Sequence, residues 1–171
     1  MPKMKLCLNL GCNEWNIVSE DPKVKWINID ADSNDKIKPD LQCRAEELPF
    51  EDNSVDEIYA GHLLEHFDMH EGEEVLKEWK RVLKPGGTIT ITVPDVEKGL
   101  KCLLKGEIGL DWYNQIVYGA NDRKRQEHHQ AFTMDILAHT MNKHFKDLTQ
   151  VDDCPYWVAN VNWQSAIQAT K

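Results

Sequence analysis

The stretch that most constrains this chain is residues 5–13, which read Lys-Leu-Cys-Leu-Asn-Leu-Gly-Cys-Asn. Apolar residues alternate with other residues until Gly11, where the pattern breaks. This predicts a buried first strand, residues 5–10, that ends in a turn where the backbone comes close to another group. The rest of the chain is then expected to add further strands beside this one.

Further strands and helices follow at short intervals. Apolar or β-branched runs predict strands at residues 24–30, 41–43, 55–60 and 88–93, and two late strands at 148–151 and 161–169. Apolar residues at helical spacing predict helices at residues 73–83, 96–104, 111–117 and 133–145, and a short helix at 13–18. Residues 31–39 are few and polar, which predicts a loop or a single turn there.

This order of elements predicts the fold class. Early strands joined by short crossovers form a parallel, doubly wound sheet. The adjacent pair of late strands indicates one antiparallel strand near the C-terminus. We therefore expect an α/β, Rossmann-like sheet that is mostly parallel. With 171 residues, the chain is expected to form a single domain spanning residues 1–171.

The composition limits the partners and the compartment. A net charge of −9 argues against extended binding to nucleic acid or to an anionic membrane, because both need basic surfaces. The five cysteines are odd in number and form no C-x-x-C pair, so reduced thiols in the cytoplasm are expected rather than disulfides or a zinc knuckle. No apolar run has the length of a signal peptide or of a bilayer span.

Two predicted strand ends point to a nucleoside ligand. Ligands of parallel α/β sheets bind beyond the carboxyl ends of the strands. Asp30 closes the second strand, where a carboxylate can accept two hydrogen bonds from a ribose diol. The turn after the first strand has one glycine, Gly11, and not the G-x-G-x-x-G series that binds a pyrophosphate in dinucleotide-binding proteins. A nucleoside cofactor without phosphates fits better, and S-adenosylmethionine is such a cofactor.

Four segments then carry recognisable signatures in one order. Residues 8–13 read L-N-L-G-C-N, residues 45–56 read A-E-E-L-P-F-E-D-N-S-V-D, residues 64–66 read L-E-H, and residues 81–87 read R-V-L-K-P-G-G. Together they resemble class I S-adenosylmethionine-dependent methyltransferases, and among these the small type 11-like domains. The resemblance implies the seven-stranded methyltransferase fold with abbreviated crossovers. It also implies methyl transfer from S-adenosylmethionine, which leaves as S-adenosylhomocysteine.

The resemblance implies cofactor-binding roles for the residues that match the signatures. The residues implied around the methionine part are Leu10, Gly11, Cys12 and Asn13 from the first strand, and Ala60, Gly61 and His62 from the fourth. The residues implied around the ribose and the adenine are Asp30, Ala31, Arg44, Ala45 and Glu46. In this set Asp30 holds the ribose hydroxyls, and Ala31 lies under the adenine.

Three residues depart from the family pattern. Asn13 replaces a second glycine, and Asn is the non-glycine residue that best tolerates a left-handed backbone. Asn9 replaces a frequent acid. Arg44 replaces an Asp that usually accepts from the adenine amino group; because Arg can only donate, it would stack on the base or turn to solvent. These departures leave open a catalytically inactive binding protein with the same fold.

The acceptor site is expected near a histidine pair. Methyl transfer from a sulfonium depends mainly on positioning, and a base helps when the nucleophile is a hydroxyl or a protonated amine. Of four candidates, His62, His66, His128 and His129, the resemblance implies that the last two lie over the pocket mouth, so His128 and His129 are the predicted catalytic residues. No N/D-P-P-Y signature follows the fourth strand, which favours O- or N-methylation of a small-molecule acceptor over DNA methylation.

Two patterns have competing interpretations. Trp112 and Tyr113 either line an acceptor pocket or form the packed face of a short helix, and we expect the packed face. Residues 62–66 match H-x-x-E-H, the inverted zinc-peptidase motif, which needs both histidines on one helix face. Because the motif here directly follows a predicted strand, a zinc peptidase is only the alternative, and no metal ligand is expected.

Overall fold

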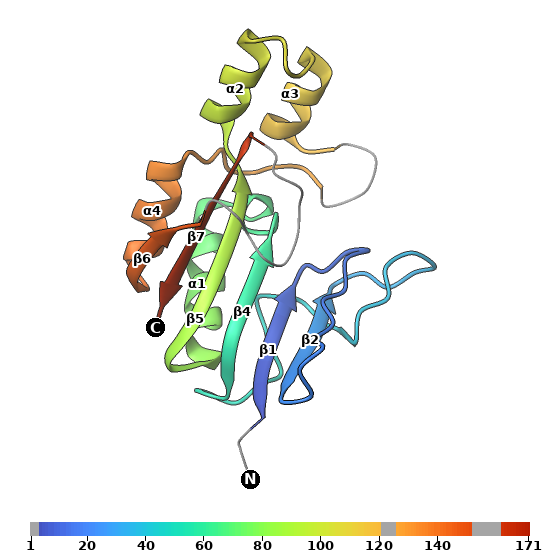
Figure 1. Ribbon diagram of the computed structural model, residues 1–171, viewed down its shortest axis with the longest axis vertical. Coiled ribbons are helices and arrows are strands. Elements are labelled where there is room, and N and C mark those ends of the chain that lie inside the picture. Colours follow the sequence, from blue (N-terminus) through green and yellow to red (C-terminus); the bar gives the residue numbers. More distant parts are fainter. Residues whose placement is uncertain (1–3, 121–125, 152–161) are drawn as a thin grey trace.

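The computed structural model describes residues 4–120, 126–151 and 162–171. Within them, seven strands form one sheet in the order β3-β2-β1-β4-β5-β7-β6 (Figure 1). The strands are β1 (Lys5–Leu10), β2 (Val24–Asp30), β3 (Leu41–Gln42), β4 (Val55–Gly61), β5 (Leu83–Pro94), β6 (Lys146–Gln150) and β7 (Gln164–Thr170). All pairings are parallel except that β7 runs antiparallel to β5 and β6. The predicted fold class is therefore confirmed, including one antiparallel strand near the C-terminus.

Four α-helices are described beside the sheet. They are α1 (Met69–Val82), α2 (Val96–Leu104), α3 (Leu110–Tyr118) and α4 (Met134–Asn142), with a single 3-10 turn, η1 (Leu64–His66). Figure 1 shows α1 behind the centre of the sheet, and α2 and α3 side by side beyond the end of β5. In the described part of the chain, no helix is both long enough and apolar enough to cross a bilayer.

The short helix predicted at residues 13–18 is wrong, because side chains of the sheet hold this segment in an open conformation. The Asn9 amide donates to the carbonyl of Trp15 (2.9 Å) and to Asn28 Oδ1 (2.9 Å). The same Asn28 oxygen accepts from the backbone N–H of Ile17 (2.7 Å). These side chains take the backbone groups that a helix would have paired internally.

Several predicted boundaries differ from the structure, the starts of α1 and β5 by four and five residues. Helix α1 starts four residues before the predicted residue 73, because Asp68 and Glu71 form a capping box ahead of it. The Asp68 carboxylate accepts from the backbone N–H groups of His70 and Glu71, each at 2.8 Å. Strand β5 begins at Leu83, directly after α1, whereas the sequence predicted a strand from residue 88. Residue 161, the predicted start of the last strand, lies outside the described residues.

The two faces of the sheet differ in chemistry. One face is apolar and packs on α1 and α4, in a core that contains Leu8, Leu10, Ile58, Ile89, Ile91, Val93, Val75, Leu76, Trp79, Leu137, Met141 and Ile167. On the opposite face, the strand registers align a row of polar side chains: Asn28, Asn9, Tyr59, Thr90 and Gln168. This row bonds internally, for example from the Gln168 amide to Thr90 Oγ1 (3.3 Å), which offsets the cost of burying polar groups.

Candidate functional site

Three cavities meet at the carboxyl ends of β1, β2 and β4. The large cavity, about 380 Å³, is lined from β2 and from the segments after β1, β3 and β4, with Asp30 and Ala31 among its residues. The small cavity, about 100 Å³, lies behind the turn after β1. The third, about 240 Å³, is lined by Trp112 and Trp163 and is called the tryptophan cavity below. Asn13 and His62 line all three, so the cavities converge at these two residues.

The turn after β1 has the left-handed backbone that its sequence predicts. Gly11 has φ of 65° and Asn13 has φ of 46°, both in the region that glycine and asparagine tolerate best. A Cβ on Gly11 would lie 3.0 Å from Leu63 Cδ1, so the backbone also passes close to the segment after β4. Asn13 therefore preserves the turn that a second glycine would make.

Asp30 holds this turn and still faces the large cavity. Its Oδ2 accepts from the backbone N–H of Asn13 (2.8 Å), and its Oδ1 accepts from that of Asp32 (2.9 Å). An ionised carboxylate offers about four acceptor positions, so about two remain. The carboxylate is thus fixed at both oxygens and keeps the capacity to accept two hydrogen bonds from a ligand.

The residues predicted around the adenine all line the large cavity. They are Ala31, Arg44, Ala45 and Glu46. The Arg44 guanidinium forms an ion pair with Glu46, and the Arg44 side chain is 61% exposed to solvent. Ala45 is buried, and its carbonyl accepts from Trp79 Nε1 (2.9 Å), which fixes this wall to helix α1.

Four further predicted residues lie beneath or behind the site. Leu10 and Ala60 belong to the buried core under the strand ends. Cys12 and Gly61 line the small cavity, and burial raises the pKa of the Cys12 thiol to about 12. A Cβ on Gly61 would lie only 2.5 Å from the hydroxyl oxygen of Tyr59, so this position has no room for a side chain.

His62 stands at the meeting point with its ring held from two sides. Its backbone is left-handed, with φ of 51°. Its Nε2 lies 3.0 Å from Gln164 Oε1, and its Nδ1 lies 3.4 Å from Oε1 of the buried Glu65. Burial alone would lower the pKa of His62, but Glu65 and Gln164 together outweigh burial and raise it. Burial alone would raise the pKa of Glu65, but His62 and His66, with a backbone hydrogen bond, hold it below its usual value.

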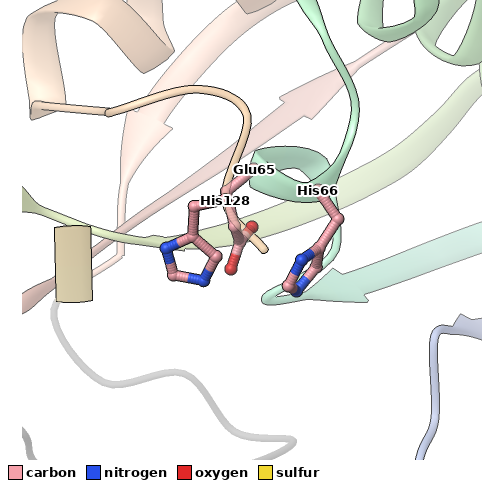
Figure 2. Close-up of side chains that lie close together, drawn as sticks. All are labelled: Glu65, His66 and His128. Carbon is pink, nitrogen blue, oxygen red and sulfur yellow. The ribbon is translucent and has the colours of Figure 1, made fainter. Parts of the chain in front are cut away.

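The predicted histidine pair divides between two cavities. His128 lines the tryptophan cavity, whereas His129 lines the large one. His128 Nδ1 lies 3.0 Å from the carbonyl of Ile116, and burial lowers the pKa of this imidazole. Figure 2 shows His128, Glu65 and His66 together, with the carboxylate of Glu65 between the two imidazoles. The His66 and His128 ring centroids are 5.0 Å apart.

Two tryptophans lie at this site, and of these the sequence offered only Trp112 as a candidate. Trp112 lines the tryptophan cavity, so the expectation that it only packs within its helix is wrong. Its ring meets that of Trp163 edge to face, with centroids 6.1 Å apart. Trp163 lies within the predicted strand 161–169, and nothing in the local sequence distinguishes it from an ordinary strand residue. Tyr113 instead packs against Gly99, as expected for a helix face.

The H-x-x-E-H segment does not have the geometry of a zinc peptidase. His62 follows β4, and η1 contains only Leu64–His66. The two histidines therefore do not share one face of an α-helix, which the peptidase motif requires.

Comparison with known proteins gives the family. The model of a methyltransferase domain matches residues 6–91, half of the chain. No curated protein sequence matches. A methyltransferase from Thermotoga maritima, described as S-adenosylmethionine-dependent and as a possible histamine N-methyltransferase, has 18% identity and a TM-score of 0.63, with 100% of this chain and 84% of that chain covered.

Two further solved structures share the fold. An S-adenosylmethionine-dependent methyltransferase from Archaeoglobus fulgidus has 16% identity and a TM-score of 0.64, over 98% of this chain and 86% of that one. The 1,6-didemethyltoxoflavin-N1-methyltransferase of Burkholderia thailandensis, solved with 1,6-didemethyltoxoflavin and S-adenosylhomocysteine, has 14% identity and a TM-score of 0.61, over 99% and 72%. With the match over half of its length, this chain belongs to the class I S-adenosylmethionine-dependent methyltransferases.

Proposed function

We propose that this chain, as one domain over residues 1–171, transfers the methyl group of S-adenosylmethionine to a small-molecule acceptor. The observation that carries the proposal is the junction of the large and tryptophan cavities at Asn13 and His62. Methyl transfer needs donor and acceptor in line across a short gap. Two cavities that meet at one point, one suited to a nucleoside and one to an aromatic ligand, supply that arrangement.

The cofactor occupies the large cavity in this proposal. Asp30 accepts from the ribose hydroxyls with its two remaining acceptor positions, while Ala31 and Ala45 border the adenine. The methionine part follows the turn at Gly11 and Asn13, and the methyl group points past His62 into the tryptophan cavity. The fixed Asp30 carboxylate supports this orientation, since both of its oxygens are already anchored.

The departures from the family pattern are compatible with cofactor binding. The left-handed backbone of Asn13 supports the same turn as a glycine would. Asn9 anchors the segment after the turn rather than facing the cofactor. Arg44 is neutralised by Glu46, so it leaves no unpaired cation at the adenine end. These contacts favour an active enzyme over an inactive binding protein.

The acceptor occupies the tryptophan cavity. Two tryptophan rings at right angles favour a flat or aromatic molecule, because such rings bind others edge to face or offset. The volume of about 240 Å³ suits a small molecule rather than a polymer. His128 reaches the acceptor in this proposal, and His129 borders the cofactor. O- or N-methylation remains the proposed chemistry, and the Burkholderia thailandensis protein is by its name an N1-methyltransferase of 1,6-didemethyltoxoflavin.

The compartment proposed is the cytoplasm. Cys7, Cys12, Cys43 and Cys102 are all free thiols in the described part of the chain. Reduced cysteines at buried positions are typical of a reducing compartment.

Calorimetry with S-adenosylmethionine and S-adenosylhomocysteine tests the proposal first, and methyl transfer from labelled cofactor to a panel of small aromatic amines and alcohols tests it second. We expect both nucleosides to bind. Trp112→Ala is expected to weaken acceptor use while it leaves cofactor affinity unchanged, since Trp112 lines the tryptophan cavity and is not among the residues that line the large cavity. No binding of either nucleoside to the wild-type chain would refute the function.

A further inference from the structure

We propose that Glu65, His66 and His128 together bind one divalent first-row transition-metal ion at the boundary of the large and tryptophan cavities. One ligand atom from each of the three side chains lies within 4.8 Å of the other two. Figure 2 shows the Glu65 carboxylate between the two imidazoles. His66 lines both cavities, whereas Glu65 and His128 line the tryptophan cavity. The sequence had predicted no metal ligand.

The hydrogen bonds of both imidazoles leave the second ring nitrogen ready to bind an ion. His66 Nδ1 lies 3.0 Å from the carbonyl of Glu127, and His128 Nδ1 lies 3.0 Å from the carbonyl of Ile116. A carbonyl oxygen only accepts, so both Nδ1 atoms must carry the proton. Each neutral ring then has a lone pair on Nε2, and a backbone carbonyl on the other nitrogen is the usual support of a metal-binding histidine.

The unsatisfied carboxylate of Glu65 supports a metal ion independently of the distances between the three side chains. Its side chain is 1% exposed, yet neither oxygen has a hydrogen-bond partner among the described residues. His62 Nδ1 lies 3.4 Å from Oε1, close enough for the ion pair described above but longer than an ordinary hydrogen bond, so this contact does not satisfy the two carboxylate oxygens. Buried polar atoms are nearly always satisfied, so a missing partner calls for an explanation. A metal ion between Glu65 and the two Nε2 atoms supplies that partner.

The backbone holds the three ligands together although His128 is far from the others in sequence. The N–H groups of His129 and Gln130 both donate to the carbonyl of Glu65, at 2.8 and 3.2 Å. The N–H of His128 donates to the carbonyl of Tyr118 at 3.1 Å. These bonds tie the segment after residue 126 to η1 on one side and to α3 on the other. The site is therefore built by the fold, and only side-chain adjustment is needed to close it.

The ligand set indicates the class of ion. Two imidazoles and one carboxylate suit zinc, cobalt, manganese or iron, whereas magnesium and calcium prefer oxygen ligands. With bonds of about 2.0–2.2 Å, a tetrahedral ion would draw its ligand atoms to about 3.3 Å from one another. Three protein ligands leave at least one coordination position open, and all three ligands line the tryptophan cavity. The acceptor in the proposed function would fill that position with an oxygen or nitrogen; only this last step rests on that function.

Metal titration of the whole chain tests the site. Tag-free protein is stripped with a chelator, desalted and titrated calorimetrically with Zn²⁺, Co²⁺ and, for comparison, Mg²⁺. We expect one Zn²⁺ or Co²⁺ per chain, weak or no Mg²⁺ binding, and a Co²⁺ spectrum without the strong charge-transfer band of a thiolate. His66→Ala and His128→Ala should each weaken binding at least about a hundredfold. His139→Ala, an exposed histidine on α4, is the matched control and should bind as the wild type does.

Three results would overturn the site. The first is a wild-type chain that binds neither Zn²⁺ nor Co²⁺ stoichiometrically. The second is unchanged affinity in both histidine variants, and the third is a Co²⁺–thiolate spectrum, which would assign the ion to cysteine. If an alanine variant does not fold, Glu65→Gln, which keeps the shape of the side chain, decides by the same loss of affinity. Titration of metal-free protein with S-adenosylhomocysteine separates the two proposals, because the large cavity binds the nucleoside without the ion.

Discussion

At the scale of single residues, Asp30 has a structural role in the turn after β1 and a proposed role in cofactor binding, and a single substitution affects both. Its carboxylate fixes the turn through Asn13 and Asp32, and in the proposed function it also holds the ribose. Asp30→Ala is expected to lower the affinity for S-adenosylhomocysteine at least about tenfold, since a charged bidentate acceptor contributes about 1.5–3 kcal/mol. Calorimetry measures this loss.

Asp30→Asn separates the two tasks of this residue. It keeps the size of the side chain and one oxygen for the turn, but it loses the charge and half of the acceptor positions. Its affinity should fall nearly as far as that of Asp30→Ala, with a smaller loss of stability. An unchanged affinity in both variants would contradict the ribose role.

The sequence could predict the parts of the site that are local. Gly11, Asn13 and Asp30 lie within one strand–turn–strand unit, so the strand pattern alone predicts that they lie close together at the ends of β1 and β2. The approach of His128 to Glu65 could not be predicted in the same way. It depends on backbone bonds between η1 and a segment some sixty residues later, and no local propensity encodes such a contact.

At the scale of elements, Asp95 connects four segments. Its Oδ1 accepts from the N–H groups of Glu97 and Lys98 at the start of α2, at 3.0 and 2.9 Å. Its Oδ2 accepts from the N–H of Met134 (3.1 Å) at the start of α4 and from Ser165 Oγ (2.6 Å) in β7. The side chain follows β5 directly and is 2% exposed. Asp95 therefore acts as a structural anchor behind the site.

Asp95→Ala is expected to lower the free energy of unfolding by about 3 kcal/mol, because it leaves several buried donors without an acceptor and removes a helix cap. Urea unfolding measures the change. Asp68→Ala is the matched control, since it removes the cap of α1 at an exposed position and should cost less. Equal losses in the two variants would contradict the anchoring role of Asp95.

A second connection between elements should depend on pH. Glu73 on α1 bonds Lys143 Nζ and His144 Nε2, both at 2.7 Å, just after α4. The bond to Lys143 and then that to His144 hold the pKa of Glu73 below its usual value. A lowered pKa adds stability that is complete above the usual pKa of a glutamate and is lost as the pH falls through the pKa of the folded state.

Glu73→Gln should therefore reduce the urea midpoint at neutral pH, and the difference from wild type should shrink towards about pH 3. A difference that stays constant over this range would show that the side chain contributes through packing rather than through charge. The loss is expected to be small, since the carboxylate is 31% exposed and solvent screens it.

The bounds of an element were predicted best where its own apolar periodicity determines them, without bonds from side chains of other elements. Strands β1 and β2 and helix α2 have the bounds that their apolar patterns predict. The segment at 13–18 was wrong because Asn9 and Asn28, on two other strands, compete for its backbone. Such side-chain to backbone bonds override helix propensity, and they become visible only once the strands are paired.

At the scale of the whole molecule, ligand binding should appear as stability. A ligand that binds only the folded state at about one hundred times its Kd adds about 2.7 kcal/mol. For a chain of this size, S-adenosylhomocysteine should then raise the Tm by about 5–10 °C. Adenosine triphosphate is the control and should leave the Tm unchanged, because the single-glycine turn does not cradle a pyrophosphate. An unchanged Tm with saturating S-adenosylhomocysteine would contradict the assignment of the large cavity.

The global architecture was predictable, but the acceptor side was not. Ordered signatures from residue 8 to residue 87 set the sheet and the cofactor end. The tryptophan cavity is formed by α3, by the segment after residue 126 and by Trp163, which come together only through long-range packing. Its chemistry was therefore the part that required the structure.

The position of β7 has a consequence for synthesis. This strand follows both β5 and β6 along the chain, yet it lies between them, and all of its residues pair with β5. During translation, β1 to β5 can assemble while residues 164–170 are still inside the ribosome, and the edge of β5 stays unpaired in that interval. Unpaired edges invite wrong pairing with other chains. A nascent chain of this protein should therefore need a chaperone most just before β7 emerges, while Ile91 and Val93 on β5 still lack their partners in β7.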